Sequence, residues 1–270
     1  MPSPDGIRHV DVEELRIRVS VRGTGRPLLL IMGIGASLDL WGPFETAIAG
    51  RGIQTIAYDA PGTGESTQYR RPRRIPGLAR TVVGLLDALG HDRVDVLGVS
   101  FGGGVAQELA HLAPQRVRRL VLAATMPGLG GLPGNPRALL AMATPRRYHD
   151  QEYFAQIAPK LYGGAARHHP DATLLAAQHR FAHPPSLTGY AAQLWAMSGW
   201  TSLPYLHRLP QRTLVLAGDD DPIVPGINGR MLAWRIPHAR LVVVRGGGHL
   251  FLLEQAGLVA QLVTDFLAEP

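Results

Sequence analysis

Short apolar runs that alternate with helical patterns constrain the fold of this chain more than any other sequence feature. Residues 28–32 and 120–124 are continuous apolar runs, a pattern typical of buried strands in a parallel sheet, and residues 241–244 indicate a further strand. Between such runs apolar residues recur at helical spacing, as in residues 78–89. Alternating strands and helices form a mainly parallel sheet with right-handed crossovers. We therefore predict an α/β fold with a central, mainly parallel sheet flanked by helices.

Two stretches depart from this alternation. Residues 15–21 alternate between apolar and polar side chains, which predicts a half-exposed strand near a sheet edge. Residues 126–209 carry no strand pattern, because prolines and glycines interrupt them and their apolar segments are short. A long insertion between two core strands is typical of a cap over the strand ends. We expect a core of residues 1–125 and 210–270, and a helical cap (lid) of residues 126–209.

The composition of the chain and the distribution of its charged residues exclude several functions. Its 270 residues include no cysteine, which excludes disulfides, thiolate metal sites and cysteine nucleophiles. The net charge of +6 comes from scattered arginines without interleaved aromatic residues, so we expect a solvated basic surface and no nucleic-acid binding. His179 and His183 have the spacing of a metal-binding pair, but Pro184 follows directly and no nearby carboxylate completes a site. We expect no metal and no cofactor.

The chain also lacks recognisable membrane or export signals. Residues 1–6 contain no apolar core of a signal peptide. No apolar stretch approaches the roughly 20 residues that a membrane-spanning helix needs. We expect a cytoplasmic protein, and nothing in the sequence indicates its oligomeric state.

A serine lies between two glycines where a predicted strand meets a predicted helix. Residues 98–102 read Gly-Val-Ser-Phe-Gly and follow the strand pattern of residues 94–97. Glycines two positions on either side of Ser100 remove the side chains that would collide in so sharp a turn, which leaves the hydroxyl projecting from the strand end. The motif alone is weak evidence in a glycine-rich chain, so its meaning depends on a base and an acid elsewhere.

Two later loops supply that acid and base. A serine hydroxyl is a poor nucleophile near neutral pH, so a histidine must take its proton and a carboxylate must orient the histidine. Residues 218–225 follow one predicted strand and include three adjacent aspartates, and His249 ends a glycine run after another strand. Adjacent side chains cannot all point at one imidazole. We assign Asp221 as the acid, since Pro222 would stiffen the chain there, and His249 as the base.

Acyl transfer would also place negative charge on the substrate's carbonyl oxygen, which preorganised N–H groups must meet. The amide of Phe101, directly after the serine, is one natural donor. The amide of Ile34, in the glycine loop of residues 33–35, is the other. Together these residues would form an oxyanion hole made of backbone alone.

The chain resembles the α/β-hydrolase superfamily throughout and, within it, the intracellular depolymerases of medium-chain-length polyhydroxyalkanoates. The likeness rests on residues 33–36, 76–79, 120–125, 145–148, 162–164, 199–202, 216–222, 232–237 and 248–252. The resemblance implies an α/β-hydrolase fold and a serine-dependent polyester hydrolase with Ser100 as nucleophile, Asp221 as acid and His249 as base. Phe101 stands where those enzymes commonly carry tryptophan, and Met32 where asparagine is expected.

The sequence leaves the substrate pocket and the exact activity more open. Candidate substrate-binding residues are Met32, Tyr190, Trp195, Trp200 and Leu250, although the three large aromatic residues could equally form plain cap core. We predict hydrolysis of hydrophobic esters, with a polyester substrate and association with polymer granules. The alternatives are a carbon–carbon bond hydrolase, a cofactor-free perhydrolase and a non-catalytic binding protein on the same scaffold.

Overall fold

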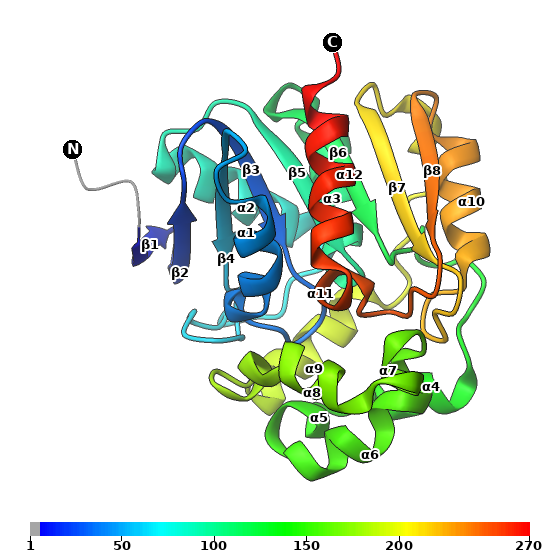
Figure 1. Ribbon diagram of the computed structural model, residues 1–270. Coiled ribbons are helices and arrows are strands. Elements are labelled where there is room, and N and C mark those ends of the chain that lie inside the picture. The colour runs from blue at the N-terminus through cyan, green and yellow to red at the C-terminus, as the bar shows by residue number, and fades with distance from the viewer. Residues whose placement is uncertain (1–5) are drawn as a thin grey trace.

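A computed structural model describes residues 6–270 and is built around one eight-stranded sheet (Figure 1). The strand order is β1-β2-β4-β3-β5-β6-β7-β8. β2 is antiparallel to both β1 and β4, and the remaining neighbours are parallel. The bounds are β1 Gly6–Val12, β2 Leu15–Arg22, β3 Arg26–Ile31, β4 Ile53–Tyr58, β5 Val94–Val99, β6 Val117–Ala123, β7 Arg212–Gly218 and β8 Ala239–Val244. The predicted fold class is confirmed.

Helices cover both faces of this sheet. α1 packs beside α12 on one face, and α2 packs beside α3 on the other (Figure 1). The bounds are α1 Gly42–Ile48, α2 Ile75–Leu89, α3 Phe101–Leu112, α10 Gly226–Arg235, α11 Phe251–Glu254 and α12 Ala256–Ala268, with short 3₁₀ turns η1 Leu38–Trp41, η2 Pro114–Arg116 and η4 Leu206–Arg208. Strand side chains such as Leu29, Leu97 and Leu122 are fully buried between the layers. The apolar runs that form β3 and β6 therefore have the two-sided burial that their pattern predicts. The strand at residues 241–244 is part of β8, which lies at the sheet edge, and Val243 there is 43% exposed.

The expectation of a half-exposed strand near a sheet edge at residues 15–21 is right about the edge and wrong about the exposure. β2 is the second strand from the edge, because β1 pairs along its outer side. The polar side chains of Arg18 and Ser20 are buried, with 4% and 0% of their surface exposed. The Arg18 guanidinium is buried in an ionic network and Ser20 Oγ accepts a hydrogen bond from Arg22 Nε, whereas Arg16 is exposed.

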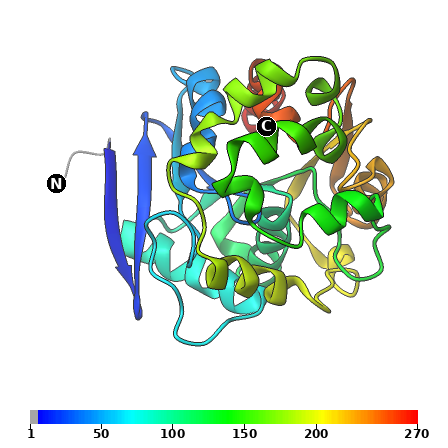
Figure 2. The same ribbon diagram turned by 90° about the horizontal axis from the view of Figure 1, so that it is seen from below.

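The segment between β6 and β7 is helical and lies at the carboxyl ends of the parallel strands (Figure 2). Its elements are α4 Pro136–Ala141, α5 Arg146–His149, α6 Gln151–Tyr162, α7 Ala165–His168, α8 Pro170–Ala176, η3 Gln178–Phe181 and α9 Leu187–Met197. Phe154, Leu161 and Ala177 from this segment form a second apolar cluster with Ile223 and Val224 from the loop after β7. The segment thus has a small core of its own, which a core loop completes. The predicted cap boundaries, 126 and 209, stay a prediction.

Two expectations concern membranes and export. None of the helices in residues 6–270 combines the length and apolar character that crossing a bilayer requires. The expected absence of a signal peptide concerns the first residues, of which 1–5 lie outside the described part of the chain.

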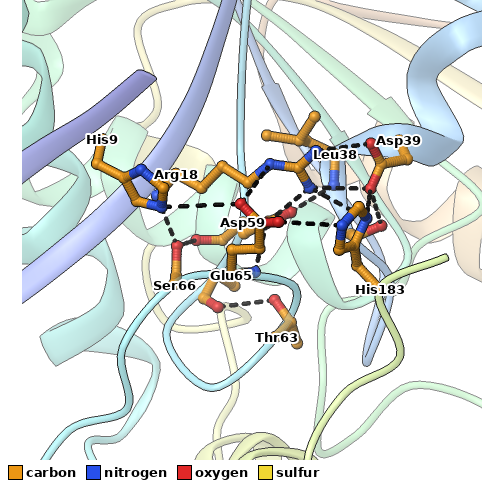
Figure 3. A network of polar contacts seen from close by, with 11 residues as sticks. His9, Arg18, Leu38, Asp39, Asp59, Thr63, Glu65, Ser66 and His183 are labelled. Atoms are coloured by element: carbon orange, nitrogen blue, oxygen red, sulfur yellow. Dashed lines mark hydrogen bonds and ion pairs between the residues drawn. The ribbon is translucent and has the colours of Figure 1, made fainter. Parts of the chain in front are cut away.

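A buried ionic network joins the helical segment to the sheet (Figure 3). The Arg18 guanidinium donates to both carboxylate oxygens of Asp39, at 2.9 and 3.0 Å, and to Asp59 at 3.3 Å. His183, which the sequence analysis weighed as half of a metal pair, contacts Asp39 at 2.8 Å and Glu65 at 3.1 Å. His183 belongs to the segment between β6 and β7, so the network links that segment to β2 and to the loops after β3 and β4.

The network predicts a pH dependence of stability. Burial alone would raise the pKa of Asp39, but hydrogen bonds from Arg18 and Ser37 outweigh burial and lower it. A carboxylate with a lowered folded-state pKa stabilises the fold above its unfolded pKa of about 3.9, and this contribution disappears as pH falls through the folded value. Asp39→Asn should therefore lower the free energy of unfolding most above about pH 5 and progressively less below about pH 4. Urea denaturation across this range measures the difference.

The exposed Asp11→Asn variant is the matched control, because Asp11 lies on the surface of β1. It should change stability little at any pH. A loss in Asp39→Asn that stays constant from about pH 6 to about pH 3 would contradict a role for the Asp39 charge.

Candidate active site

Ser100 lies on the turn between β5 and α3, in a backbone conformation that is unusual for a serine. Its φ is 53° and its ψ −118°, in a region where non-glycine residues are strained. Three hydrogen bonds hold the turn. The Ser100 amide donates to the Ala123 carbonyl at 2.9 Å, and its own carbonyl accepts from the Gly103 amide at 2.9 Å and the Thr125 hydroxyl at 2.7 Å. The turn is therefore fixed by β6, by the first turn of α3 and by the Thr125 side chain.

The flanking glycines are required by close backbone contacts. A Cβ on Gly98 would lie 2.5 Å from the Gly102 carbonyl oxygen, and a Cβ on Gly102 would lie 2.1 Å from the Ile31 carbonyl oxygen. Both distances are far below van der Waals contact, and neither obstacle is a movable side chain. These contacts give the glycine–x–serine–x–glycine pattern its physical reason.

The serine, histidine and aspartate predicted from sequence meet at this turn. The Ser100 Oγ lies 3.1 Å from His249 Nε2, and His249 Nδ1 lies 2.7 Å from Asp221 Oδ2. His249 and Asp221 are buried, with 6% and 7% of their surface exposed. The other Asp221 oxygen accepts the amides of Ile223 and Val224, each at 2.9 Å. The carboxylate is thus fixed in place and has one oxygen free for the imidazole.

The tight turn at residues 162–164 packs against both the loop that carries Asp221 and the loop that carries His249. The His249 amide donates to the Tyr162 carbonyl at 2.7 Å, and the Gly164 amide donates to Asp220 Oδ2 at 2.7 Å. A Cβ on Gly164 would lie 2.1 Å from the Gly248 nitrogen. Sequence reasoning gave this turn no role in the site. Its signals in the sequence were the two adjacent glycines and its place among the stretches that resemble the depolymerases.

The glycine loop at residues 33–35 lies beside the serine, as the sequence predicts. A Cβ on Gly33 would be 3.5 Å from the Ser100 Cβ. The loop is held by two contacts to the helical segment, because the Gly35 amide donates to Gln193 and the Tyr148 hydroxyl donates to the Ile34 carbonyl. Among residues 6–270, neither the Ile34 amide nor the Phe101 amide donates to a protein acceptor. Both amides therefore remain available at the serine.

Two cavities meet at Ser100, and both also contact Ile34 and Met142. The first, which we call the apolar cavity, has a volume of about 300 Å³. Its lining is mainly apolar and comprises Phe101, Gly104, Thr125, Met126, Leu139, Ala143, Leu194, Met197, Trp200, Ile223 and Val224. The second, which we call the arginine cavity, has a volume of about 60 Å³ and includes His249, Arg147 and Arg180 in its lining.

Three of the five predicted substrate-binding residues line these cavities and two do not. Met32 and Leu250 line the arginine cavity, and Trp200 lines the apolar cavity. Tyr190 is 1% exposed and packs under the glycine loop, where its hydroxyl donates to the Met142 carbonyl. Trp195 is 43% exposed and is covered by the Arg74 guanidinium, 3.8 Å from its ring centre. Helical spacing does not show which of these aromatic side chains faces inward.

Within the described part of the chain, no group of three or more His, Asp or Glu side chains could hold a metal ion. The chemistry that the residues provide is a hydroxyl, an imidazole and a carboxylate in series, with two free amides beside the hydroxyl.

Comparison with known proteins agrees with this geometry. The family model described as "alpha/beta hydrolase fold" matches residues 26–256. A poly(3-hydroxyalkanoate) depolymerase of Ectopseudomonas oleovorans is 46% identical over 100% of this chain and 95% of its own length. A 2-hydroxymuconate semialdehyde hydrolase of Pseudomonas sp. (strain CF600) is 31% identical over 99% of this chain and 95% of its own. The solved structure of a thermophilic esterase from Thermogutta terrifontis has a TM-score of 0.80 and 25% identity, covering 97% of this chain and 98% of that one.

This chain belongs to the α/β-hydrolase fold family. The predicted family is confirmed, as is its predicted likeness to polyhydroxyalkanoate depolymerases. The prediction that the chain is a hydrolytic enzyme is confirmed as well.

The close backbone contacts around the Ser100 turn predict that one added methyl group will destabilise the protein. Gly102→Ala would force a Cβ against the Ile31 carbonyl, so we expect a loss of about 1–3 kcal/mol in the free energy of unfolding from overpacking. Gly257→Ala is the matched control, because a Cβ at that helical position meets nothing within 4 Å. It should be neutral or slightly stabilising. Equal stability of the two variants in chemical denaturation would disprove this account of the turn.

Proposed function

We propose that this protein is a carboxylic ester hydrolase in which Ser100 is the nucleophile, His249 the general base and Asp221 the residue that orients it. The observation that carries the proposal is the continuous hydrogen-bonded series from Asp221 through His249 to Ser100, with distances of 2.7 and 3.1 Å, at the junction of two cavities. The family and its depolymerase and esterase relatives support ester hydrolysis as the reaction class.

The geometry supports a two-step acyl transfer. His249 takes the Ser100 proton as the Oγ forms a bond to the ester carbonyl carbon, and Asp221 stabilises the imidazolium. The tetrahedral species then collapses, the carbon–oxygen ester bond breaks, and His249 gives its proton to the departing alkoxide. Water, deprotonated by His249, attacks the acyl-enzyme in the same way, and the proton returns to Ser100 as the carboxylic acid leaves.

The backbone supports the charge that develops on the carbonyl oxygen. The amides of Ile34 and Phe101 flank Ser100 and have no protein acceptor in the described chain. Preorganised donors of this kind stabilise an oxyanion in a buried site more than water would. Because both donors belong to the backbone, Phe101 and Met32 can differ from the residues common in related depolymerases without loss of this function.

We further propose a hydrophobic polyester, of the polyhydroxyalkanoate class, as the substrate. The apolar cavity beside Ser100 suits an alkyl-bearing acyl chain, and the depolymerase relative is similar over the whole chain. Leu139 and Leu194 line that cavity and are 41% and 37% exposed, and neighbouring Leu140 is 76% exposed. These leucines would face a polymer granule. Residues 126–209 would act as the cap that shapes both cavities.

A carbon–carbon bond hydrolase is the second candidate, because 2-hydroxymuconate semialdehyde hydrolase relatives are 31% and 34% identical over nearly the whole chain. Turnover of aryl esters of graded acyl length, measured beside turnover of a ring-cleavage diketone, separates the two activities. Faster hydrolysis of the diketone than of every ester would favour the second candidate.

The role of Ser100 has a direct test. Ser100→Ala removes the attacking oxygen, so kcat/KM for p-nitrophenyl octanoate should fall at least about 10³-fold. Ser198→Ala, at an exposed serine of the helical segment, should retain the parent activity. Retention of activity within about tenfold in Ser100→Ala would exclude the mechanism.

The apolar cavity predicts a shift in acyl-length preference. Met197 lines this cavity, and Met197→Trp would fill part of it, so hydrolysis of octanoate esters should decline by about tenfold or more relative to butyrate esters. Met197→Leu conserves volume and should leave the ratio nearly unchanged. An unchanged octanoate-to-butyrate ratio in Met197→Trp would show that the acyl chain lies elsewhere.

A further inference from the structure

Two arginines are buried in the cavity that adjoins the catalytic residues. Arg147 and Arg180 are only 1% and 2% exposed, which places them among the largest fully buried side chains of the protein. Both line the arginine cavity together with Ser100 and His249. Arg147 comes from α5 and Arg180 from η3, so the helical segment delivers both charges to the site.

Neither guanidinium has an acidic partner among residues 6–270. Arg147 donates from Nη1 to the Thr144 carbonyl at 3.1 Å and the Tyr190 hydroxyl at 2.8 Å. Arg180 donates from Nη1 to the Tyr162 hydroxyl at 2.9 Å. The Nε atoms of both arginines are buried without a hydrogen-bond partner.

Two buried positive charges destabilise the fold unless a negative charge lies close to them. Arginine stays protonated in proteins, and burial of an uncompensated charge destabilises a fold by several kcal/mol. The ring of Tyr148 contacts both guanidiniums, at 4.6 and 5.2 Å from its centre, but a neutral ring cannot neutralise two charges. Burial would raise the pKa of Tyr162, yet Arg180 and Arg147 outweigh burial and lower it. The cavity therefore favours an anion.

We propose that Arg147 and Arg180 bind the free carboxylate at the end of a linear ester substrate. A carboxylate is planar and matches the forked donors of a guanidinium. The proposal rests on the proposed ester hydrolase function and adds to it the end of the chain that the enzyme recognises.

The position of His249 determines which side of the ester bond lies in this cavity. His249 lines the arginine cavity but not the apolar cavity. The departing alkoxide needs the His249 proton, so the alcohol portion of the ester lies with the arginines and the acyl portion lies in the apolar cavity. In an oligomer of hydroxy acids, the terminal alcohol portion carries the free carboxylate. The enzyme therefore cleaves from the carboxyl end and releases a short hydroxy acid.

A matched pair of substrates tests the proposal. One is a two-unit oligomer of 3-hydroxyoctanoate with a free carboxylate, and the other is the methyl ester of its carboxyl end. We expect the parent enzyme to hydrolyse the internal ester of the free acid with a kcat/KM at least about tenfold higher. Arg147→Met and Arg180→Met should abolish most of this preference, and Arg180→Lys, which keeps the charge, should retain part of it.

Neutral p-nitrophenyl octanoate is the internal control, because it carries no carboxylate. In each arginine variant the kcat/KM of the free acid should fall at least about threefold further than that of p-nitrophenyl octanoate. Arg208→Met, at an exposed site, controls for net charge and should retain the preference. Equal rates for acid and methyl ester in the parent, or a parallel loss of p-nitrophenyl octanoate hydrolysis in the variants, would overturn the proposal. No hydrolysis of any ester by the parent would instead overturn the proposed function.

A binding measurement keeps the proposal testable if an arginine variant does not fold. Ser100→Ala, with both arginines intact, should bind 3-hydroxyoctanoate at least about tenfold more tightly than methyl 3-hydroxyoctanoate in calorimetry. Equal affinities would show that the arginines do not recognise a carboxylate.

Discussion

The close approach between the Ser100 turn and the end of β3 is the constraint on which the rest of the site depends. The backbone of Gly102 lies so near the Ile31 carbonyl that no side chain fits between them. This contact lets α3 begin directly beside the loop of residues 33–35, so that one serine lies next to two free amides. The unusual φ of Ser100 is tolerated because three hydrogen bonds from β6 and its neighbourhood and from α3 hold the turn. Ser100, the proposed nucleophile, is thus positioned by backbone packing of the sheet.

The helical segment contributes more than a cover over this site. Its turn at residues 162–164 touches both the loop that carries Asp221 and the loop that carries His249. Ile223 and Val224, whose amides hold the Asp221 carboxylate, are part of the small core of that segment. The Arg18 network fixes the segment at another point, through His183. Movement of the segment would therefore disturb the acid and the base as well as the entrance.

Much of this arrangement could be predicted from sequence, and particular residues show why some could not. Ser100, Asp221 and His249 were found because each follows a strand, and the structure brings them into hydrogen-bond contact. The exposure expected of β2 was wrong because Arg18 and Ser20 have buried polar partners, which an alternating pattern does not record. Trp195 lies at the surface and Tyr190 under the glycine loop, because the helix that carries them is buried on only part of its circumference. Arg147 and Arg180 gave no signal, since arginine is usually exposed.

The sequence by itself determined the alternation of core strands and helices from β2 onward and the positions of the serine, aspartate and histidine along the chain. It could do so because periodicity is a local property, and because parallel strands bring their carboxyl ends to one edge of the sheet. Only the tertiary structure decided which side chains of the helical segment between β6 and β7 face Ser100 and that two uncompensated arginines lie beside it. Those features depend on how short helices from distant parts of the chain are oriented, and no local pattern records that orientation.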